Sequence, residues 1–316
     1  SLLPNAKIAS IFFGGGTPSL MPAATVATII EYIDKLWPHE NPIEVTLEAN
    51  PSSVEAERFK DYKLASVNRV SLGIQSLRDE DLQFLGRLHN AKEALSALDI
   101  AKNTFEHISF DLIYALPKQS LGSWQKELEY ALTYAGDHLS LYQLTIEEGT
   151  AFHHQFNRGK FSLPDEDLAV SMYEITQDLT TKAGLPAYEV SNHARPGSMS
   201  RHNLYYWQSL PFFGIGPGAH GRLPGNTPYT TTAHAQIKRP EDWLKAVTDI
   251  GCGMESFEKI SADDRAEEAL LMGLRLNSGI ERMQFTQVIG RDVTDYLDLE
   301  RLGELQQDGF ITLDEH

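Results

Sequence analysis

The sequence predicts an α/β protein whose core is a parallel sheet, either closed into an α/β barrel or left open. Two observations lead to this class. Short runs rich in β-branched and aromatic residues recur along the first half of the chain, and segments with helical spacing lie between them. The runs follow one another at roughly 30 residues, a spacing typical of right-handed βαβ crossovers. The chain of 316 residues, 41% of them hydrophobic, is long enough for a sizeable core.

The predicted strands are nearly continuous in hydrophobicity, as expected of strands buried on both faces of a parallel sheet. They are 8–13 (IASIFF), 43–47 (IEVTL), 69–74 (RVSLGI), 108–114 (ISFDLIY) and 139–145 (LSLYQLT).

The predicted helices show apolar residues at spacings of three and four. In 23–36 the apolar stripe consists of Val26, Ile29, Ile30, Ile33 and Leu36. The other helices predicted in this half are 53–64, 91–102 and 123–134.

The alternation of short strands and helices ends after about residue 150. The segment 165–182 is predicted to be one long helix. Gly, Pro, His, Tyr and Trp are frequent from 186 to 237, which indicates functional loops over a short strand or two. Helical spacing returns after Arg239, and a turn at 309–313 leads into a predicted strand. We therefore expect a partial barrel at 1–185, a motif-rich extension at 186–237 and a helical C-terminal domain at 238–316.

The predicted helices of the C-terminal domain include 262–276 and 294–307. A helix pair followed by a β element resembles a small winged-helix module, cut short. The acidity of the chain favours a partner or lid element over a DNA-binding one.

Composition excludes several classes of protein. The chain carries 27 Lys and Arg against 44 Asp and Glu, and this net charge of −17 argues against nucleic acid as the main partner. Its one cysteine, Cys252, cannot form an internal disulfide, so a cytoplasmic location is expected. No apolar stretch is long enough for a transmembrane helix, and Ser1 to Pro4 show no signal-peptide pattern.

Polar residues gather where the predicted strands end, which is where parallel barrels place their chemistry. Gly14, Gly15 and Gly16 follow the first strand, where glycine lets the backbone approach a ligand, although a tight turn needs the same residues. Later strands carry the polar residues Glu48, Gln75, Asp111, Tyr142, Gln143, Thr145 and Glu147. Glu48 and Asp111 would need partners if buried, and Arg87 is a candidate.

The second half contains several histidines. His202 begins the segment HNLYYW, which combines a potential iron ligand with three aromatic rings. By residue type alone, a packed aromatic turn with His202 bonded to the backbone is the simpler interpretation. His193 and His220 are secondary candidates. His153 and His154 make a poor metal site and are predicted to lie in a surface loop.

Eight motifs in fixed order resemble the radical S-adenosylmethionine enzymes of the oxygen-independent coproporphyrinogen III oxidase group. They are GGGTPS (14–19), EANP (48–51), SLGIQS (71–76), DLIYALP (111–117), LYQLTIE (141–147), YEVSNHARP (188–196), HNLYYW (202–207) and GIGPGAHG (214–221). The resemblance covers nearly the whole chain. HNxxYW and GIGxGAHG are typical of the heme chaperones of the HemW type rather than of the coproporphyrinogen dehydrogenases. The implied fold is a partial (β/α) barrel of the radical SAM type.

The resemblance implies an S-adenosylmethionine site on this chain. In the family, the glycine motif cradles the amino group and backbone region of the cofactor, which corresponds to Gly15, Gly16 and Thr17. Glu48 resembles the acidic residue after the next strand, and a carboxylate suits an α-ammonium group. Further contacts around the barrel resemble Gln75, Arg87 and Asp111, whose chemistry suits a ribose hydroxyl or the methionine carboxylate.

The resemblance also implies a heme site at His202, Asn203, Tyr206 and Trp207, which reverses the preference for a packed turn. The expected function is a heme chaperone that passes heme to acceptor hemoproteins. Peripheral membrane association through such acceptors and a homodimer are further expectations. The main alternative is the oxidative decarboxylation of coproporphyrinogen III to protoporphyrinogen IX. A barrel hydrolase or isomerase without a cluster is a third hypothesis, which the matching motifs disfavour.

The chain departs from the family pattern in one respect. The CxxxCxxC motif, which holds a [4Fe-4S] cluster through three thiolates, is not in this sequence. The family's first strand and helix and its final strand and helix are not recognisable either. We therefore expect a portion of a longer protein, which cannot hold the cluster or cleave S-adenosylmethionine as it stands.

Overall fold

The computed structural model describes residues 6–314. The chain forms two compact units, residues 1–202 and 203–316. The expectation about a signal peptide falls on Ser1 to Pro4, which lie outside the described residues.

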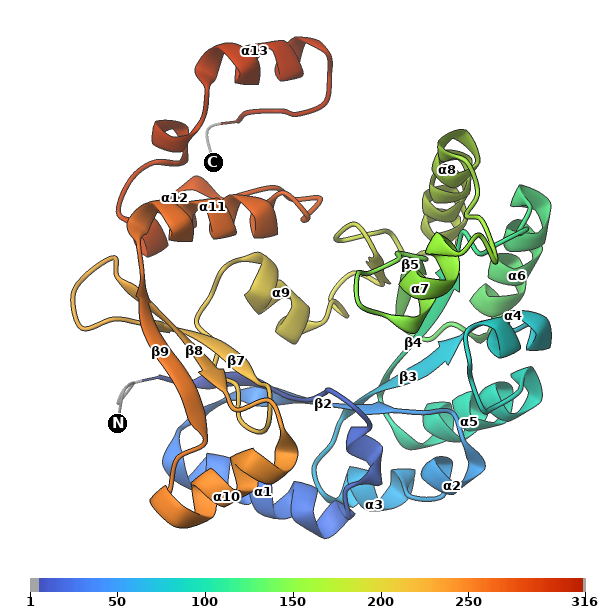
Figure 1. Cartoon of the computed structure of the whole chain (residues 1–316), viewed down its shortest axis with the longest axis horizontal. Helices are drawn as coiled ribbons and strands as arrows, with labels where there is room; N and C mark the ends of the chain where they lie inside the picture. Colours follow the sequence, from blue (N-terminus) through green and yellow to red (C-terminus); the bar gives the residue numbers. More distant parts are fainter. Residues whose placement is uncertain (1–5, 315–316) are drawn as a thin grey trace. The chain divides into compact units, whose positions relative to one another are not determined.

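A six-stranded sheet forms the centre of the first unit, and its strands follow one another in chain order (Figure 1). They are β1 (Ile8–Phe13), β2 (His39–Ala49), β3 (Arg69–Gln75), β4 (His107–Tyr114), β5 (His138–Gln143) and β6 (Asn192–Ala194). The first five strands pair in parallel, as predicted. The short β6 lies within 186–237, where a short strand or two were expected, and it pairs antiparallel with β5, which was not predicted.

Eight helices belong to the described part of the first unit, together with the 3₁₀ turn η1 (Pro18–Leu20). They are α1 (Ala23–Leu36), α2 (Ser53–Ala56), α3 (Phe59–Leu64), α4 (Asp79–Phe84), α5 (Ala91–Thr104), α6 (Leu121–Tyr134), α7 (Ala151–Asn157) and α8 (Glu166–Lys182). The helix predicted over 53–64 divides into α2 and α3, and α4 was not predicted. The surface loop predicted at His153 and His154 was wrong, because Thr150 accepts a hydrogen bond from the amide of His153 and starts α7.

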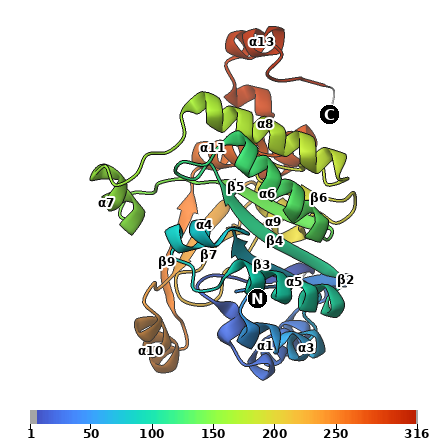
Figure 2. The same cartoon turned by 90° about the vertical axis from the view of Figure 1, so that its right-hand side faces the viewer.

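The apolar core lies on the helix-covered face of the sheet. Leu47, Leu72, Phe110 and Leu139 are fully buried there. Trp124 of α6 stacks on Tyr114 of β4 with ring centroids 4.8 Å apart. Its indole nitrogen donates to Thr176 Oγ1 at 2.8 Å, which joins α6 to α8, the neighbouring helix in Figure 2.

The opposite face of the sheet is polar. Along β2, Glu44, Thr46 and Glu48 alternate with the apolar Val45 and Leu47. The pairing register continues this face into the other strands through Arg69, Ser71, Ser109, Asp111, His138, Ser140 and Asn192. The strands are therefore apolar on one face and polar on the other. Most of the polar face is buried as well, so the prediction of strands buried on both faces is confirmed, although the second face is lined by polar side chains.

The second unit contains an antiparallel sheet of three strands. These are β7 (His220–Pro224), β8 (Thr231–Gln236) and β9 (Met254–Ile260). The helices are α10 (Pro240–Ile250), α11 (Ala262–Gly273), α12 (Arg282–Ile289) and α13 (Leu299–Gln307), and α9 (Arg201–Trp207) begins in the first unit.

Three predictions for this region need correction. β9 lies in a stretch expected to be helical, because its pairing with β8 outweighs local propensity. The helix expected over 294–307 begins as a 3₁₀ turn, Val293–Tyr296, followed by α13. Residues 309–314 form no strand in the described chain, so the β element of the winged-helix prediction was wrong. The left-handed backbone of Gly309, with φ +77°, follows the end of α13.

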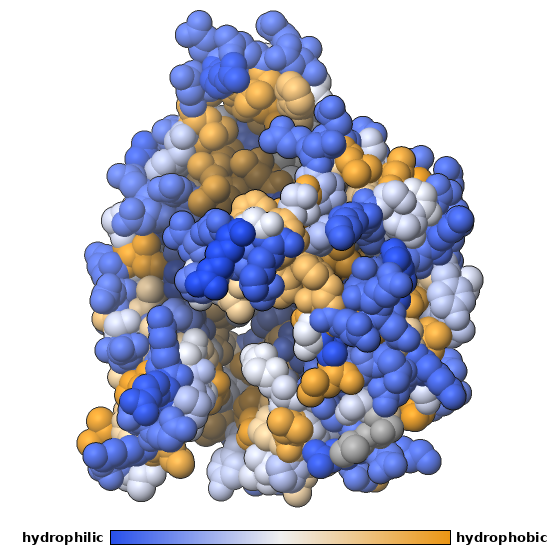
Figure 3. All heavy atoms as spheres, turned by 45° about the vertical axis from the view of Figure 1, so that its right-hand side comes forward, coloured by the Kyte–Doolittle hydropathy of each residue, from blue (hydrophilic) through white to orange (hydrophobic). Residues whose placement is uncertain are grey.

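Hydrophilic residues cover most of the face seen in Figure 3, in keeping with the net charge of −17. Within residues 6–314, no helix combines the length and apolarity that crossing a membrane requires.

Candidate functional site

The glycine loop after β1 contacts the end of β2 directly. The amide of Gly15 donates to Glu48 Oε2 at 3.2 Å. Gly15 has φ +117°, and open space surrounds the position of a side chain at Gly15 and at Gly16. A ligand could therefore approach the backbone closely here. Burial raises the pKa of Glu48, and the hydrogen bond from Gly15 opposes this shift.

Buried polar residues hold the rest of this loop in place. Asn50 Nδ2 lies 3.5 Å from Thr17 Oγ1, and the amide of Asn50 donates to Glu55 Oε2 at 2.8 Å. The hydroxyl of Ser19 also donates to Glu55. Thr17 is thus fixed through Asn50 to the start of α2.

Gln75 and Asp111 form a second group on the polar face, and Arg87, in the exposed loop after α4, acts on Asp111 through its charge. Gln75 Nε2 donates to Asp111 Oδ2 at 2.5 Å. Burial raises the pKa of Asp111 to about 6, although the positive charge of Arg87 acts in the opposite direction. Glu48, Gln75 and Asp111 lie on adjacent parallel strands toward their carboxyl ends. The structure therefore places Glu48, Gln75 and Asp111, with the glycine loop beside Glu48, toward the same edge of the sheet.

The backbone at Gln75 is held in the left-handed region, with φ +73°. This conformation is costly for a residue other than glycine and needs support from its surroundings. Glu127 of α6 supplies it, because its Oε1 accepts from Ser76 Oγ at 2.6 Å and from the amide of Leu77 at 2.8 Å. Burial raises the pKa of Glu127, and these two bonds oppose the shift.

Replacing Glu127 by Ala is expected to lower the free energy of unfolding by about 2 kcal/mol, because one buried and one partly buried donor lose their acceptor. Urea denaturation followed by circular dichroism measures this change. Glu129→Ala is the matched control on the same helix, since Glu129 is exposed and its carboxylate accepts a hydrogen bond from the partly exposed Gln125. Equal midpoints for the two variants would contradict the role of Glu127.

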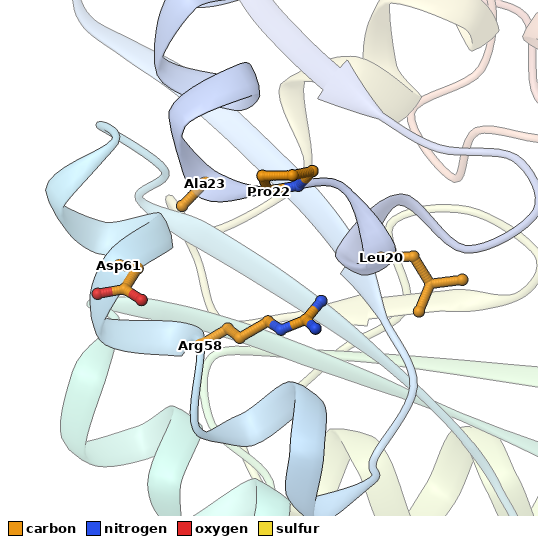
Figure 4. Close-up of a pocket in the computed structure, with 5 residues that line it drawn as sticks. All are labelled: Leu20, Pro22, Ala23, Arg58 and Asp61. Atoms are coloured by element: carbon orange, nitrogen blue, oxygen red, sulfur yellow. The ribbon is translucent and has the colours of Figure 1, made fainter.

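Two cavities stand out in the described part of the first unit. One of about 550 Å³ adjoins the carboxyl end of β5, and its lining includes Tyr142, Gln143, Thr145 and Tyr173. The other, of about 320 Å³, lies on the helical side and is lined by Leu20, Pro22, Ala23, Arg58 and Asp61. Figure 4 shows the Arg58 side chain extending toward Leu20, and its Nη1 donates to the carbonyl of Ser19 at 3.3 Å. None of the residues predicted to bind a ligand lines this second cavity.

His202 lies at the start of α9, inside the first unit. Its ring stacks on Phe12 with centroids 4.0 Å apart and an interplanar angle of 10°. Burial lowers the pKa of His202 to about 4. The imidazole is therefore neutral at physiological pH, which is the form that binds iron.

The remaining residues of the HNLYYW segment belong to the second unit. Tyr206 contacts Phe212 with ring centroids 4.3 Å apart, and burial raises the pKa of its hydroxyl. Trp207 receives the guanidinium of Arg275 at 4.4 Å from its ring centroid, and its Nε1 is buried without a hydrogen-bond acceptor among residues 6–314. Asn203 lies between these aromatic residues and His202 on the same helix.

His193 and His220, the secondary candidates, differ in burial. His193 is 1% exposed, and neither ring nitrogen has a hydrogen-bond partner in the part of the chain that the structure describes. His220 is exposed in β7. Next to it, Gly221 leaves room for the ring of His234, which a side chain at Gly221 would strike. Cys252 is exposed and free, and no group of three metal-binding side chains occurs in the described residues.

Comparison with known proteins identifies the family. Residues 2–131 match the Radical SAM superfamily, and residues 260–316 match the HemN C-terminal domain. The heme chaperone HemW of Haemophilus influenzae is 39% identical over 90% of this chain and 72% of its own length. This chain belongs to the HemW-type group of the radical S-adenosylmethionine superfamily. The predicted family is thereby confirmed.

A mouse relative, the mitochondrial radical S-adenosyl methionine domain-containing protein 1, is 43% identical over 89% of this chain. The chain spans 64% of the length of that relative. Among solved structures, coproporphyrinogen III oxidase (HemN) from Escherichia coli matches 98% of this chain and 73% of its own, with a TM-score of 0.78 and 20% identity. This likeness confirms the partial radical SAM barrel as the fold.

The residues of this chain fit the family's S-adenosylmethionine but not its cluster. The open space over Gly15 and Gly16, beside the carboxylate of Glu48, suits the amino-acid end of that cofactor. A [4Fe-4S] cluster needs three thiolates, whereas this sequence contains one cysteine. Residues 1–316 by themselves therefore do not hold the cluster.

The sequence pattern did not single out Phe12 and Glu44, which contact His202, or Arg69, which pairs with Glu44. The alternation of Glu44, Thr46 and Glu48 in β2 was an available signal for a polar face. Phe12, which stacks on His202, gave no such signal. It belongs to an apolar run, and nothing in the sequence distinguishes it from the other apolar residues of β1.

Proposed function

We propose that this chain is the radical SAM portion of a heme chaperone, which binds heme and delivers it to acceptor hemoproteins. The observation that carries the proposal is the neutral His202 at the first turn of α9, with Tyr206 one helical turn later. An imidazole is a ligand for heme iron, and the aromatic rings of Tyr206 and Trp207 offer apolar surface to a porphyrin. Asn203 completes the proposed set.

We also propose that Gly15, Gly16, Thr17 and Glu48 bind the amino-acid end of S-adenosylmethionine. The Glu48 carboxylate would pair with the α-ammonium group, and the glycine loop would border it. Gln75, Arg87 and Asp111 would bind the ribose hydroxyls or the methionine carboxylate. When bound beside a [4Fe-4S] cluster, this cofactor supplies the reactive sulfonium group. The cluster itself belongs to the full-length form in this proposal.

Hemin titration followed by Soret absorbance tests the heme site. His202→Ala is expected to weaken hemin binding by at least about tenfold, because it removes the proposed iron ligand. His154→Ala is the matched control, since His154 is exposed on α7. If His202→Ala and the parent protein bind hemin with the same affinity and spectrum, the proposed site is wrong.

A further inference from the structure

The buried carboxylate of Glu44 accepts hydrogen bonds from the backbone at the first turn of α9. The amide of Arg201 donates to Glu44 Oε2 at 3.3 Å, and the amide of His202 donates to Glu44 Oε1 at 3.2 Å. Amides at the start of a helix have no partner within the helix, so an acceptor from another element must satisfy them. Each oxygen of Glu44 therefore fixes the backbone of one residue, and His202 is one of the two.

Glu44 is itself held by Arg69. Arg69 Nε lies 3.2 Å from Glu44 Oε2, and the two side chains are 4% and 8% exposed. Arg69 Nη2 also donates to the carbonyl of Ser198 at 3.0 Å, just before α9. From the other side, Arg201 Nη1 donates to the carbonyl of Pro42 at 2.8 Å. The residues leading into His202 are thus bonded to both β2 and β3.

The ring of His202 is fixed separately from its backbone. Phe12 of β1 lies nearly parallel to the imidazole, with centroids 4.0 Å apart. A stacked neighbour of this kind disfavours rotation of the imidazole out of the stack. Three adjacent strands, β1 to β3, therefore supply the groups that determine the position of His202.

Resting on the heme site proposed above, we propose that Phe12 and the Glu44–Arg69 pair are positioning residues for His202. A ligand to iron must present its lone pair in a defined direction, and groups behind the ligand set that direction. The Glu44 carboxylate fixes the start of α9, and Phe12 fixes the plane of the ring. Hemin then meets an imidazole that needs little further ordering, which favours affinity.

Hemin titration of two positioning variants tests this proposal. Phe12→Leu keeps apolar volume but removes the stacked ring, and is expected to weaken hemin binding about fivefold. The double variant Glu44→Gln/Arg69→Gln removes both charges together, so that neither remains buried alone. It is expected to weaken binding and to give a mixture of iron coordination states by electron paramagnetic resonance. Phe156→Leu, on the partly exposed α7, is the control for a change from Phe to Leu.

The outcomes separate this inference from the proposed function. If His202→Ala weakens binding while Phe12→Leu and the double variant keep the parent affinity and spectrum, the positioning role is overturned and the heme site stands. If His202→Ala itself has no effect, the heme site is wrong. A loss of single-species iron coordination in Phe12→Leu, with an unchanged melting temperature, supports the positioning role because loss of fold cannot produce it. Should the double variant not fold, Phe12→Leu alone decides between these results.

Discussion

Replacing Arg69 by Met is expected to lower the free energy of unfolding by about 3–5 kcal/mol, because it leaves the Glu44 carboxylate buried without its counter-charge. The loss includes the hydrogen bond from Arg69 to the carbonyl of Ser198. Urea denaturation at neutral pH measures it. The double variant Arg69→Met/Glu44→Leu is expected to recover part of the loss, since no charge then remains buried.

Lys182→Met is the matched control for this prediction. Lys182 and Asp178 also form an ion pair, but both side chains are more than 70% exposed. A surface pair of this kind contributes about 0.5 kcal/mol or less. A loss in Arg69→Met no larger than that in Lys182→Met would contradict the importance assigned to the buried pair.

Replacing His193 by Leu is expected to stabilise the protein, and by more at acidic pH. Both ring nitrogens of His193 are buried without partners among the described residues, a loss of hydration that costs about 1 kcal/mol or more at pH 7. Burial also lowers the pKa of His193 from 6.5 to about 4. The unfolded chain therefore takes up a proton on this side chain as the pH falls below 6.5, whereas the folded chain does not.

The depressed pKa of His193 makes the folded state lose stability as the pH falls. The folded state keeps its full stability above pH 6.5 and loses about 3 kcal/mol of it as the pH falls to 4, at about 1.36 kcal/mol per pKa unit. His193→Leu removes this loss, so its stability advantage over the parent protein should grow between pH 6.5 and 4. Denaturation of both proteins across this range tests the prediction, with His154→Leu as an exposed control. A difference in stability that does not vary with pH would show that His193 does not titrate as described.

The parallel strands were predictable because their signal is local. Each carries enough β-branched and aromatic residues to be recognised by itself, and the order of the glycine loop, Glu48, Gln75 and Asp111 along the chain becomes their order across the sheet. The antiparallel β6 was not predictable in the same way, since three residues are too few for a periodic pattern. β9 depends on pairing with β8, which local composition does not encode.

The surroundings of His202 lay beyond sequence reasoning for a related reason. Glu44 and His202 are 158 residues apart, and Arg69 and Ser198 are 129 apart. No local spacing links such residues, and their contacts exist only once the sheet has formed. HNLYYW could suggest an iron ligand by its residue types, but it could not show which strands hold that ligand.

The antiparallel direction of β6 affects which residues around the cavity beside β5 can change without disturbing the sheet. Because β6 runs against β5, residues 144–191 leave the sheet and return to it at the same edge. This excursion contains α7 and α8 and contributes Tyr173 to the cavity beside β5. Insertions or exchanges within it would leave the register of the five parallel strands unchanged. Relatives could therefore vary the residues around the cavity beside β5 while keeping the same glycine loop and polar face.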